Sequence, residues 1–179
     1  MIYSPSDDSC LLEEQGKKYS KGKKFLDMGS GSGIQASAAK GAEASLILAV
    51  DINKEAIEIL KSKGIPAVQS DLFLNISKEN KFDIIAFNPP YLPKDKREDC
   101  ESAIATTGGR NGDELILKFL KQSQNHLNKN GIILLLLSSL TPQNKIFKLL
   151  NQLLLKHQIL SSKKLFMETL QVWKIEQKN

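Results

Sequence analysis

Runs of apolar residues alternate along the chain with segments whose apolar residues recur every three or four positions. The runs are short enough for buried strands, and the periodic segments fit helices with one inward face. The first four strands are expected at Lys24–Met28, Leu46–Val50, Pro66–Gln69 and Phe82–Phe87. A fifth is expected at Ile132–Leu137, whose unbroken apolar character is typical of a strand covered on both faces.

Segments with helical periodicity lie between these runs. Small residues at Ala36–Ala39 mark one helix, and Lys54–Lys63 forms a second with one apolar face. Asp113 starts a third helix, and Pro142–Leu154 supplies a fourth. Asn130-Gly131 is predicted to be a turn.

The last part of the chain changes pattern. Ser161–Met167 and Thr169–Ile175 alternate between apolar and polar residues, like a pair of edge strands. Strands alternating with helices predict an α/β fold: a doubly wound, mostly parallel seven-stranded sheet with an antiparallel C-terminal hairpin. The chain length fits a single domain that spans residues 1–179.

Asn88-Pro89-Pro90-Tyr91 directly follows the strand Phe82–Phe87. The prolines lack N–H groups and stiffen the backbone, so the side-chain carbonyl of Asn88 and the backbone carbonyl of Pro89 become fixed acceptors. Two acceptors suit a planar –NH2 group, and Tyr91 offers an aromatic face to that nitrogen or to a cationic methyl donor. The alternative interpretation is a Pro-Pro turn with a capping Asn.

Gly29-Ser30-Gly31-Ser32-Gly33 connects the first strand to the helix at Ala36. Glycine lets the backbone turn sharply and lets a ligand approach closely. The dinucleotide fingerprint needs two residues between its last two glycines, and Ile34 breaks that spacing. The loop therefore fits an uncharged nucleoside with an amino-acid tail better than a pyrophosphate.

Two further carboxylates follow strands. Asp51 ends the second strand about 20 residues after the glycine loop, the offset of a ribose-binding carboxylate. Helix capping is the alternative for Asp51, although Asn53 is better placed to cap. Asp71 follows the third strand and suits an adenine amino group, or equally a turn.

Two irregular segments flank these motifs. Tyr3–Leu12 is expected to be a loop that runs into a helix, with Asp8 or Ser9 capping its free N–H groups. The stretch from residue 91 to residue 113 lacks clear periodicity. Loops this long in a compact domain are usually functional, so it is expected to shape the substrate cleft. A flexible, solvated loop is the alternative for Lys94–Glu101.

The composition narrows these possibilities only slightly. The formal charge of +5 is compatible with RNA or an acidic partner, but the scattered lysines favour an ordinary solvated basic surface. The two cysteines and two histidines lack metal-ligand spacing, so no metal site is expected. The longest apolar run, Ile132–Leu137, is too short to cross a bilayer, and no secretory signal precedes Tyr3, which predicts a cytoplasmic protein.

The motifs together resemble those of class I S-adenosylmethionine-dependent methyltransferases across nearly the whole chain, and within that class they resemble the HemK family. The resemblance rests on six stretches: Pro5–Leu12, Asp27–Gly33, Asp51-Ile52-Asn53, Asn88–Tyr91, Gly108–Gly112 and Glu168-Thr169-Leu170. Asp7 and Asp27 stand where glutamate is common in the family, which preserves the charge and shortens its reach.

The resemblance implies methyl transfer from S-adenosylmethionine to the side-chain amide of glutamine in the Gly-Gly-Gln motif of a class I peptide chain release factor. Bacterial members carry a helical domain ahead of the catalytic one, whereas here the catalytic pattern begins at Tyr3. This is similar to the short archaeal and eukaryotic branch, whose members work with a small zinc-binding activator, the Trm112 protein.

The resemblance also implies roles for individual residues. Asn88 and Pro89 would bind the substrate amide, with Tyr91 packed beside it. The implied cofactor site comprises Ser9, Asp27 and Gly29 at the methionine end, Asp51 at the ribose, Asp71 and Leu72 at the adenine, and also Gly31, Gly33, Ile52 and Asn88.

Two other functions stay open. One is methylation of adenine or another exocyclic amino group of nucleic acid, and the other is a catalytically silent cofactor-binding partner subunit. A partner is also expected, because Pro66–Gln69 should lie at an edge of the sheet. There, apolar Ile65, Ala67 and Val68 would invite strand addition by a Trm112-like subunit.

Overall fold

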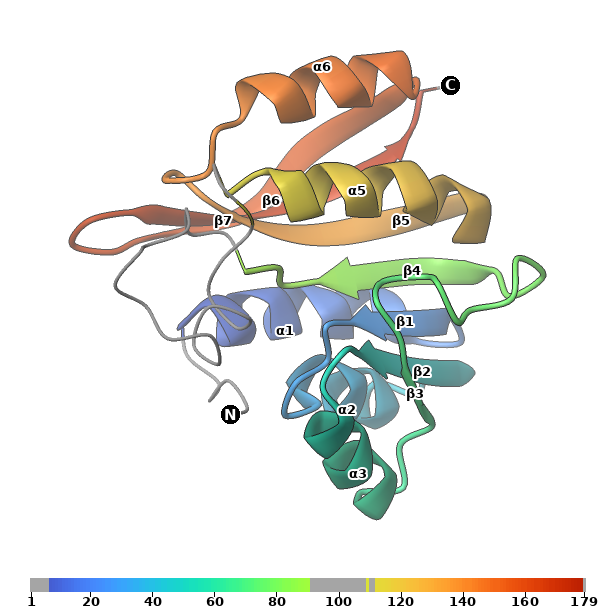
Figure 1. The fold of residues 1–179 in the computed structure, drawn as a ribbon. Coiled ribbons are helices and arrows are strands. Elements are labelled where there is room, and N and C mark those ends of the chain that lie inside the picture. The colour runs from blue at the N-terminus through green and yellow to red at the C-terminus, as the bar shows by residue number, and fades with distance from the viewer. Residues whose placement is uncertain (1–6, 91–108, 110–111, 179) are drawn as a thin grey trace.

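The computed structural model describes residues 7–90, 109 and 112–178 (Figure 1). Its centre is one seven-stranded sheet in the order β3-β2-β1-β4-β5-β7-β6. The strands are β1 Lys24–Met28, β2 Leu46–Asp51, β3 Ala67–Gln69, β4 Phe82–Phe87, β5 Leu127–Ser138, β6 Leu155–Lys164 and β7 Thr169–Gln177. The first five strands pair in parallel, and β7 is antiparallel to both β5 and β6. The predicted doubly wound sheet with an antiparallel C-terminal hairpin is confirmed.

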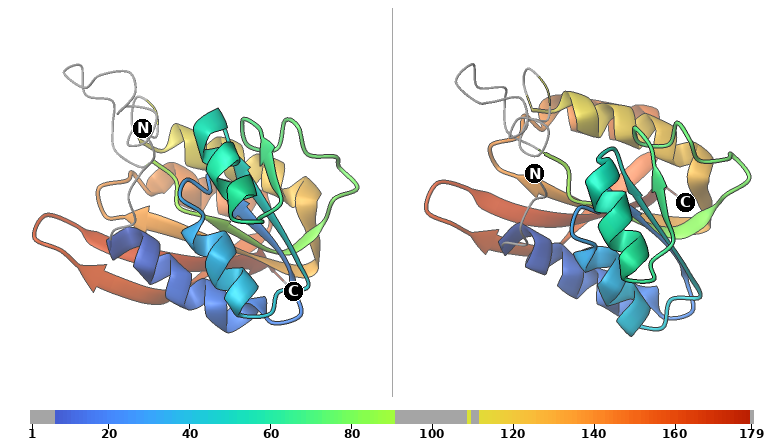
Figure 2. Two further views of the ribbon diagram at one scale, coloured as in Figure 1. Left: turned by 90° about the horizontal axis from the view of Figure 1, so that it is seen from below. Right: turned by 60° about the horizontal axis from the view of Figure 1, so that its bottom comes forward.

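Helices cover both faces of the sheet (Figures 1 and 2). One face of the sheet carries α1 Asp7–Ser20, α2 Ile34–Gly41 and α3 Lys54–Ser62. The opposite face carries α5 Glu114–Ser123, which continues into the 3-10 helix η1 Gln124–His126, and α6 Asn144–Gln152. In the described part of the chain, no helix has the length and apolar character needed to cross a membrane.

The apolar run in β5 is buried on both faces. Ile133, Leu135 and Leu137 belong to the core beneath α5 and α6. Leu134 and Leu136 point the other way and pack in the cluster that contains Leu12 of α1 and Ala39 of α2. Two-sided burial removes any reason for polar residues to alternate along the strand.

The register of the parallel strands sets where the site lies. Met28 of β1 pairs with both Val50 of β2 and Phe87 of β4. Asp51, the last residue of β2, pairs with Gln69 at the end of β3. The segments that follow these residues therefore start at one level along the carboxyl edge of the sheet, where open parallel sheets bind their ligands.

The prediction of a turn at Asn130-Gly131 is wrong. β5 begins at Leu127 and runs through both residues. Asn130 has a φ of 64°, and the register with β4 shifts between Phe82 and Ile84. A Cβ on Gly131 would lie 3.0 Å from the carbonyl oxygen of Phe82. The same residue types that make turns here make a bulge inside a strand.

The predicted end of the last helix and start of the hairpin are also wrong. α6 ends at Gln152, and Leu154 has a φ of 54° just before β6 starts at Leu155, well ahead of Ser161. Residues 156–158 are all exposed, so the first half of β6 shows no alternation. β7 lies between β5 and β6, so of the two hairpin strands β6 alone is an edge strand.

Trp173 of β7 marks the contact between α6 and the sheet. The residue is 1% exposed. Its ring centroid lies 5.4 Å from that of Phe147 in α6 and 4.2 Å from that of His157 in β6. Both pairs are stacked, a favourable arrangement for aromatic rings.

Candidate active site

The loop after β1 carries the predicted glycines. Gly31 has a φ of 52°, and a Cβ built there would meet nothing within 4 Å, so open space lies beside it. Gly33 caps α2 with a φ of 84°, and a Cβ there would lie 2.6 Å from the side chain of Leu60 in α3. Gly29 lies against Phe87 of β4. The loop is thus open at Gly31, whereas at Gly29 and Gly33 neighbouring side chains pack so closely that glycine is needed.

Asp27 lies beneath this loop. Its Oδ2 accepts from the Ser30 hydroxyl at 2.6 Å and from the Ala36 N–H at 3.0 Å. The residue is 2% exposed. Burial raises the pKa of Asp27 to about 7, the charge of Asp51 adds to the rise, and the two hydrogen bonds oppose it. A cation placed beside this carboxyl group would favour its ionised form.

Asp51 holds the rim of the glycine loop from the end of β2. Its Oδ2 accepts from the Gly31 N–H at 2.7 Å, and its Oδ1 accepts from the Asn53 N–H at 2.8 Å. The cap of α3 is Asn53, whose side chain accepts from the Glu55 N–H at 2.9 Å. Capping therefore does not account for Asp51, whose half-buried carboxylate is directed at the loop.

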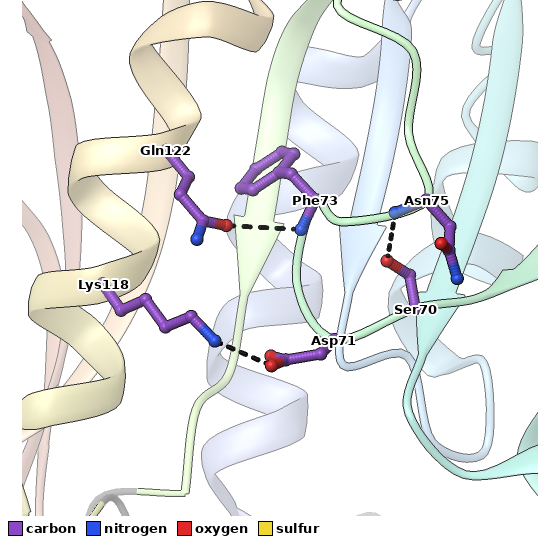
Figure 3. A network of polar contacts seen from close by, with 6 residues as sticks. All are labelled: Ser70, Asp71, Phe73, Asn75, Lys118 and Gln122. Carbon is purple, nitrogen blue, oxygen red and sulfur yellow. Dashed lines mark hydrogen bonds and ion pairs between the residues drawn. The ribbon is translucent and has the colours of Figure 1, made fainter.

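The segment after β3 is tied to α5, as Figure 3 shows. Asp71 Oδ2 accepts from Lys118 Nζ at 2.7 Å, and both side chains are nearly half exposed. The Phe73 N–H donates to Gln122 Oε1 over a long 3.5 Å. Lys118 carries no sequence signal for this role, because it looks like any lysine on the exposed face of a helix and pairs with a residue 47 positions away.

Leu72, between Asp71 and Phe73, is buried with a φ of 51°. L-residues rarely adopt this conformation, and strained backbone gathers preferentially at binding sites. The turn is closed by the Asn75 N–H, which donates to Ser70 Oγ at 2.9 Å (Figure 3). The predicted adenine end therefore has a fixed backbone.

Asn88, directly after β4, has its side-chain amide held from one side. Nδ2 donates to Asp8 Oδ2 at 3.1 Å and to Ser9 Oγ at 3.5 Å, both in the first turn of α1. A carboxylate only accepts, so this contact fixes which end of the amide faces α1. Asn88 Oδ1 is buried and has no hydrogen-bond partner among the described residues. A buried acceptor left unpaired in a native fold calls for an explanation, and a donor on a ligand is one.

Asp8 is the site residue whose role the sequence did not reveal. Its Oδ1 accepts from the N–H of the neighbouring Ser9 at 2.6 Å, whereas a capping side chain accepts from an N–H two or three residues further on. Its Oδ2 reaches Asn88, which is 80 positions away and therefore invisible to any local pattern. The Ser9 carbonyl accepts from Gln35 Nε2 at 2.9 Å and joins α1 to α2. The start of α1 is thereby fixed against the end of β4 and the start of α2.

Part of the predicted site lies outside the described residues: Tyr91, the loop Lys94–Glu101, Gly108, Arg110 and Asn111. Pro89, which follows Asn88, is buried. Among the residues that the structure describes, no group of three or more His, Cys, Asp or Glu side chains is placed to hold a metal ion.

The antiparallel β7 beside β5 separates this fold from dinucleotide-binding sheets of the same winding, whose six strands run parallel. Together with the glycine loop it defines a class I methyltransferase. The chain matches the methyltransferase small domain family over residues 8–168. A Methanocaldococcus jannaschii protein, provisionally named a protein N5-glutamine methyltransferase, is 35% identical and aligned over 96% of this chain and 89% of its own length. The chain therefore belongs to the methyltransferase small domain family and, within it, to the HemK family.

Two further likenesses bear on the substrate. The release factor glutamine methyltransferase of Rhodopirellula baltica is 32% identical over 63% of this chain, which spans only 44% of that longer protein. A chain of the solved E. cuniculi Mtq2–Trm112 complex superposes with a TM-score of 0.80, at 25% identity and with 99% of both chains covered. That complex is described as responsible for methylating the eRF1 translation termination factor.

Proposed function

We propose that the protein transfers a methyl group from S-adenosylmethionine to the side-chain amide nitrogen of glutamine in the Gly-Gly-Gln motif of a class I release factor. The observation that carries the proposal is Asn88, whose Nδ2 is anchored to Asp8 while its buried Oδ1 has no partner among the described residues. An acceptor held this way suits a substrate that brings its own N–H groups. The relatives named for release or termination factors support glutamine as the substrate residue.

The carboxyl edge of the sheet fits the methyl donor. The open side of Gly31 admits a nucleoside, and the buried carboxyl of Asp27 suits the ammonium group of the amino-acid tail. Asp51 is proposed at the ribose hydroxyls, and Asp71 with Leu72 at the adenine. The remaining proposed contacts are Ser9, Gly29, Gly33, Ile52 and Asn88. Once bound, the donor supplies a methyl group that is already activated on a sulfonium sulfur.

Asn88 and Pro89 bind and orient the substrate amide. Asn88 Oδ1 accepts from one of its N–H groups and the Pro89 carbonyl accepts from the other, and the role proposed for Tyr91 is to shield the nitrogen. An amide nitrogen is a weak nucleophile because its lone pair is delocalised, so alignment matters more than for an amine. As the nitrogen gives up electron density, its N–H groups become more acidic and both hydrogen bonds strengthen toward the transition state. No general base has to act before transfer, and the methylated amide nitrogen afterwards releases one N–H proton to water.

Asp8 and Ser9 are positioning residues in this scheme. They hold Asn88 Nδ2 and so keep Oδ1 turned toward the place where the substrate amide arrives. The rotamer of Asn88 is therefore set when the protein folds and needs no further ordering when the substrate binds. We further propose that residues 1–179 act as one methyltransferase domain, in the cytoplasm where release factors work.

The test measures transfer of a labelled methyl group to a purified release factor and, in parallel, to RNA and DNA. Asn88→Ala should lower turnover on the factor about 100- to 1,000-fold while cofactor affinity stays unchanged, because one transition-state hydrogen bond is lost. Asn151→Ala, at an exposed position of α6, is the matched control. Near-normal turnover of the Asn88 variant would contradict the assignment. Transfer to nucleic acid alone would show that nucleic acid, and not the release factor, is the substrate. No transfer to any acceptor would favour a catalytically silent partner subunit.

A Trm112-type subunit is proposed at the β3 edge. β3 does lie at the edge of the sheet, and the E. cuniculi relative was solved in complex with Trm112. The apolar surface differs from the expected one, because Ile65 and Ala67 are 3% and 9% exposed. The exposed apolar side chains are Ile52, 56%, whose carbonyl accepts from Gln69 of β3, and Leu74, 79%, in the turn after β3.

Because of these exposures, the partner site is better tested by a substitution of Leu74 than of Val68. Val68 packs against the core, so a charge there would damage the fold as well as the edge. Leu74→Lys alters only exposed surface and should abolish co-purification with a Trm112-type protein. Leu154→Lys, equally apolar and 68% exposed at the opposite end of the sheet, should leave the complex intact. A complex that survives Leu74→Lys would place the partner elsewhere.

A further inference from the structure

The hairpin between β6 and β7 ends in two exposed apolar side chains. Phe166 is 100% exposed and Met167 is 78% exposed. Single exposed apolar residues are common on protein surfaces, but an adjacent pair at the tip of a projecting hairpin is a small patch. Leu140, in the segment after β5, is 47% exposed at the same edge of the sheet.

The tip is held in place by the strands around it. The Leu165 N–H donates to the Glu168 carbonyl at 2.8 Å, which closes the turn. The Ser138 hydroxyl, at the end of β5, donates to Glu168 Oε2. The Thr169 N–H donates to Ser139 Oγ at 2.9 Å. The exposure of the patch is therefore a feature of an ordered turn, not of a frayed end.

The hairpin tip lies at the edge of the sheet that holds the active site. Leu170, the second residue of β7, pairs with Ser138 at the carboxyl end of β5. Lys163 of β6 forms an ion pair of 2.8 Å with Asp7, the chain neighbour of the Asp8 that holds Asn88. Figures 1 and 2 show the hairpin projecting past the helices on the side where α1 begins.

We propose that this tip, Phe166 and Met167, is a docking point for the body of the protein substrate whose amide enters at Asn88. The proposal rests on the proposed function. A glutamine in a folded factor reaches Asn88 only if the factor approaches this edge, and the hairpin is the described element that projects there. Aromatic and methionine side chains are enriched at the centres of protein interfaces.

The charges around the tip favour a protein over a nucleic acid. Lys163 is paired with Asp7, and the exposed Lys164 is offset by Glu168 at the other end of the turn, so the tip carries no net basic patch for phosphates. An apolar depression on the factor would bury the two side chains. This contact would add affinity for the whole factor without touching the reacting atoms.

The test compares steady-state methylation of a purified release factor by the enzyme, together with its Trm112-type subunit, and by the Phe166→Ser/Met167→Ser variant. We expect the KM for the factor to rise about tenfold, the amount that the loss of an interface anchor causes, with kcat and cofactor affinity unchanged. Leu154→Ser, which removes an exposed apolar side chain far from this edge, is the matched control and should leave KM unchanged.

An unchanged KM, or a fall in kcat alone, would overturn the docking point while leaving the proposed function standing. Loss of RNA or lipid-vesicle binding in the double variant, with KM for the factor unchanged, would also overturn it. If the unmodified enzyme transfers no methyl group to the factor, the proposed function itself fails, and that result is seen before any variant is made.

Discussion

Asp27 and Asp51 lie near the ends of neighbouring strands, and both are proposed to contact the methyl donor, yet the fold treats them differently. Asp27 is 2% exposed, and burial raises its pKa to about 7. Asp51 is half-buried and accepts from two backbone N–H groups, at 2.7 Å from Gly31 and 2.8 Å from Asn53. The Asp27 carboxyl group is costly to ionise without a cation beside it, whereas the Asp51 carboxylate helps to hold the glycine loop together.

Substitutions at these two residues should therefore have opposite effects on the stability of the protein, although both should weaken cofactor binding. Ionised Asp27 without a cation beside it is a buried, poorly solvated charge. Removing that charge should therefore stabilise the protein and weaken its binding of the cofactor. Removing Asp51 should lower both the stability of the fold and the affinity for the cofactor, because the Gly31 and Asn53 N–H groups lose their acceptor. Three measurements test this contrast and a fourth tests the neighbouring Asp71, in order of expected size.

The largest effect is expected for Asp27→Asn. The cofactor ammonium would lose its charged partner, so affinity measured by calorimetry should fall about 100-fold. Unfolding by urea at pH 8 should show the variant to be more stable than the unmodified protein, because asparagine still accepts from Ser30 and Ala36 without carrying a charge. A variant less stable at pH 8, with normal cofactor affinity, would reverse the comparison.

Asp51→Ala is expected to weaken cofactor binding about ten- to 30-fold, since charge-assisted hydrogen bonds to the ribose are lost. It should also lower the free energy of unfolding by about 1–2 kcal/mol, the cost of leaving backbone donors unpaired. Asn53→Ala is the matched control, because it removes the α3 cap but leaves the Asp51 carboxylate in place. Equal loss of affinity in both variants would show that only loop order matters.

The third effect is on pH dependence. Because the pKa of Asp27 is about 7 in the folded protein, the ionised form that suits the ammonium disappears below that pH. Cofactor affinity should therefore fall about tenfold between pH 8 and pH 6. Stability runs the other way. The folded protein holds this proton more tightly than the unfolded chain, so the free energy of unfolding should decrease with rising pH between about 4 and about 7.

That stability slope should approach roughly 1.4 kcal/mol per pH unit from this one group. Both dependences should vanish in Asp27→Asn, which provides the control. Affinity that stays flat in the unmodified protein from pH 6 to pH 8 would mean that the carboxyl group does not meet the cofactor charge.

The smallest effect is expected for Lys118→Met. The ion pair with Asp71 is nearly half exposed, at 47% and 44% for the two side chains, so solvent screens it. Cofactor affinity should fall less than threefold, because Asp71 keeps its charge and loses only an orienting partner. Lys121→Met, on an exposed turn of the same helix, controls for the change in net charge. A tenfold loss would place Lys118 in the cofactor site.

Local pattern was sufficient to predict most of the fold. Strands buried on both faces leave long apolar runs, as at β5, and the order of strands and helices implies the winding. The pattern failed where one residue type serves two structures. Asn130-Gly131 forms a bulge inside a strand, and the first half of β6 is polar because one side of an edge strand is left uncovered.

The site divides in the same way. Gly31, Asp71 and Asn88 follow strands and Asp51 ends one, so the carboxyl edge could be predicted from their spacing. The contacts that orient them could not, because Asp8 meets Asn88 from 80 positions away and Lys118 meets Asp71 from 47. Pairing over such distances is decided by how α1 and α5 pack on the sheet, which no short segment encodes.

The stack around Trp173 gives these experiments an optical readout. The chain has one tryptophan, so its emission comes from a single place in the structure. That place is the buried contact between α6 and β7, and β5 separates it from β4 and Asn88. Exposure of the indole to water should follow unfolding with little disturbance from substitutions at the carboxyl edge. The stabilities of Asp27→Asn and Asp51→Ala can thus be compared by intrinsic fluorescence, without adding a dye.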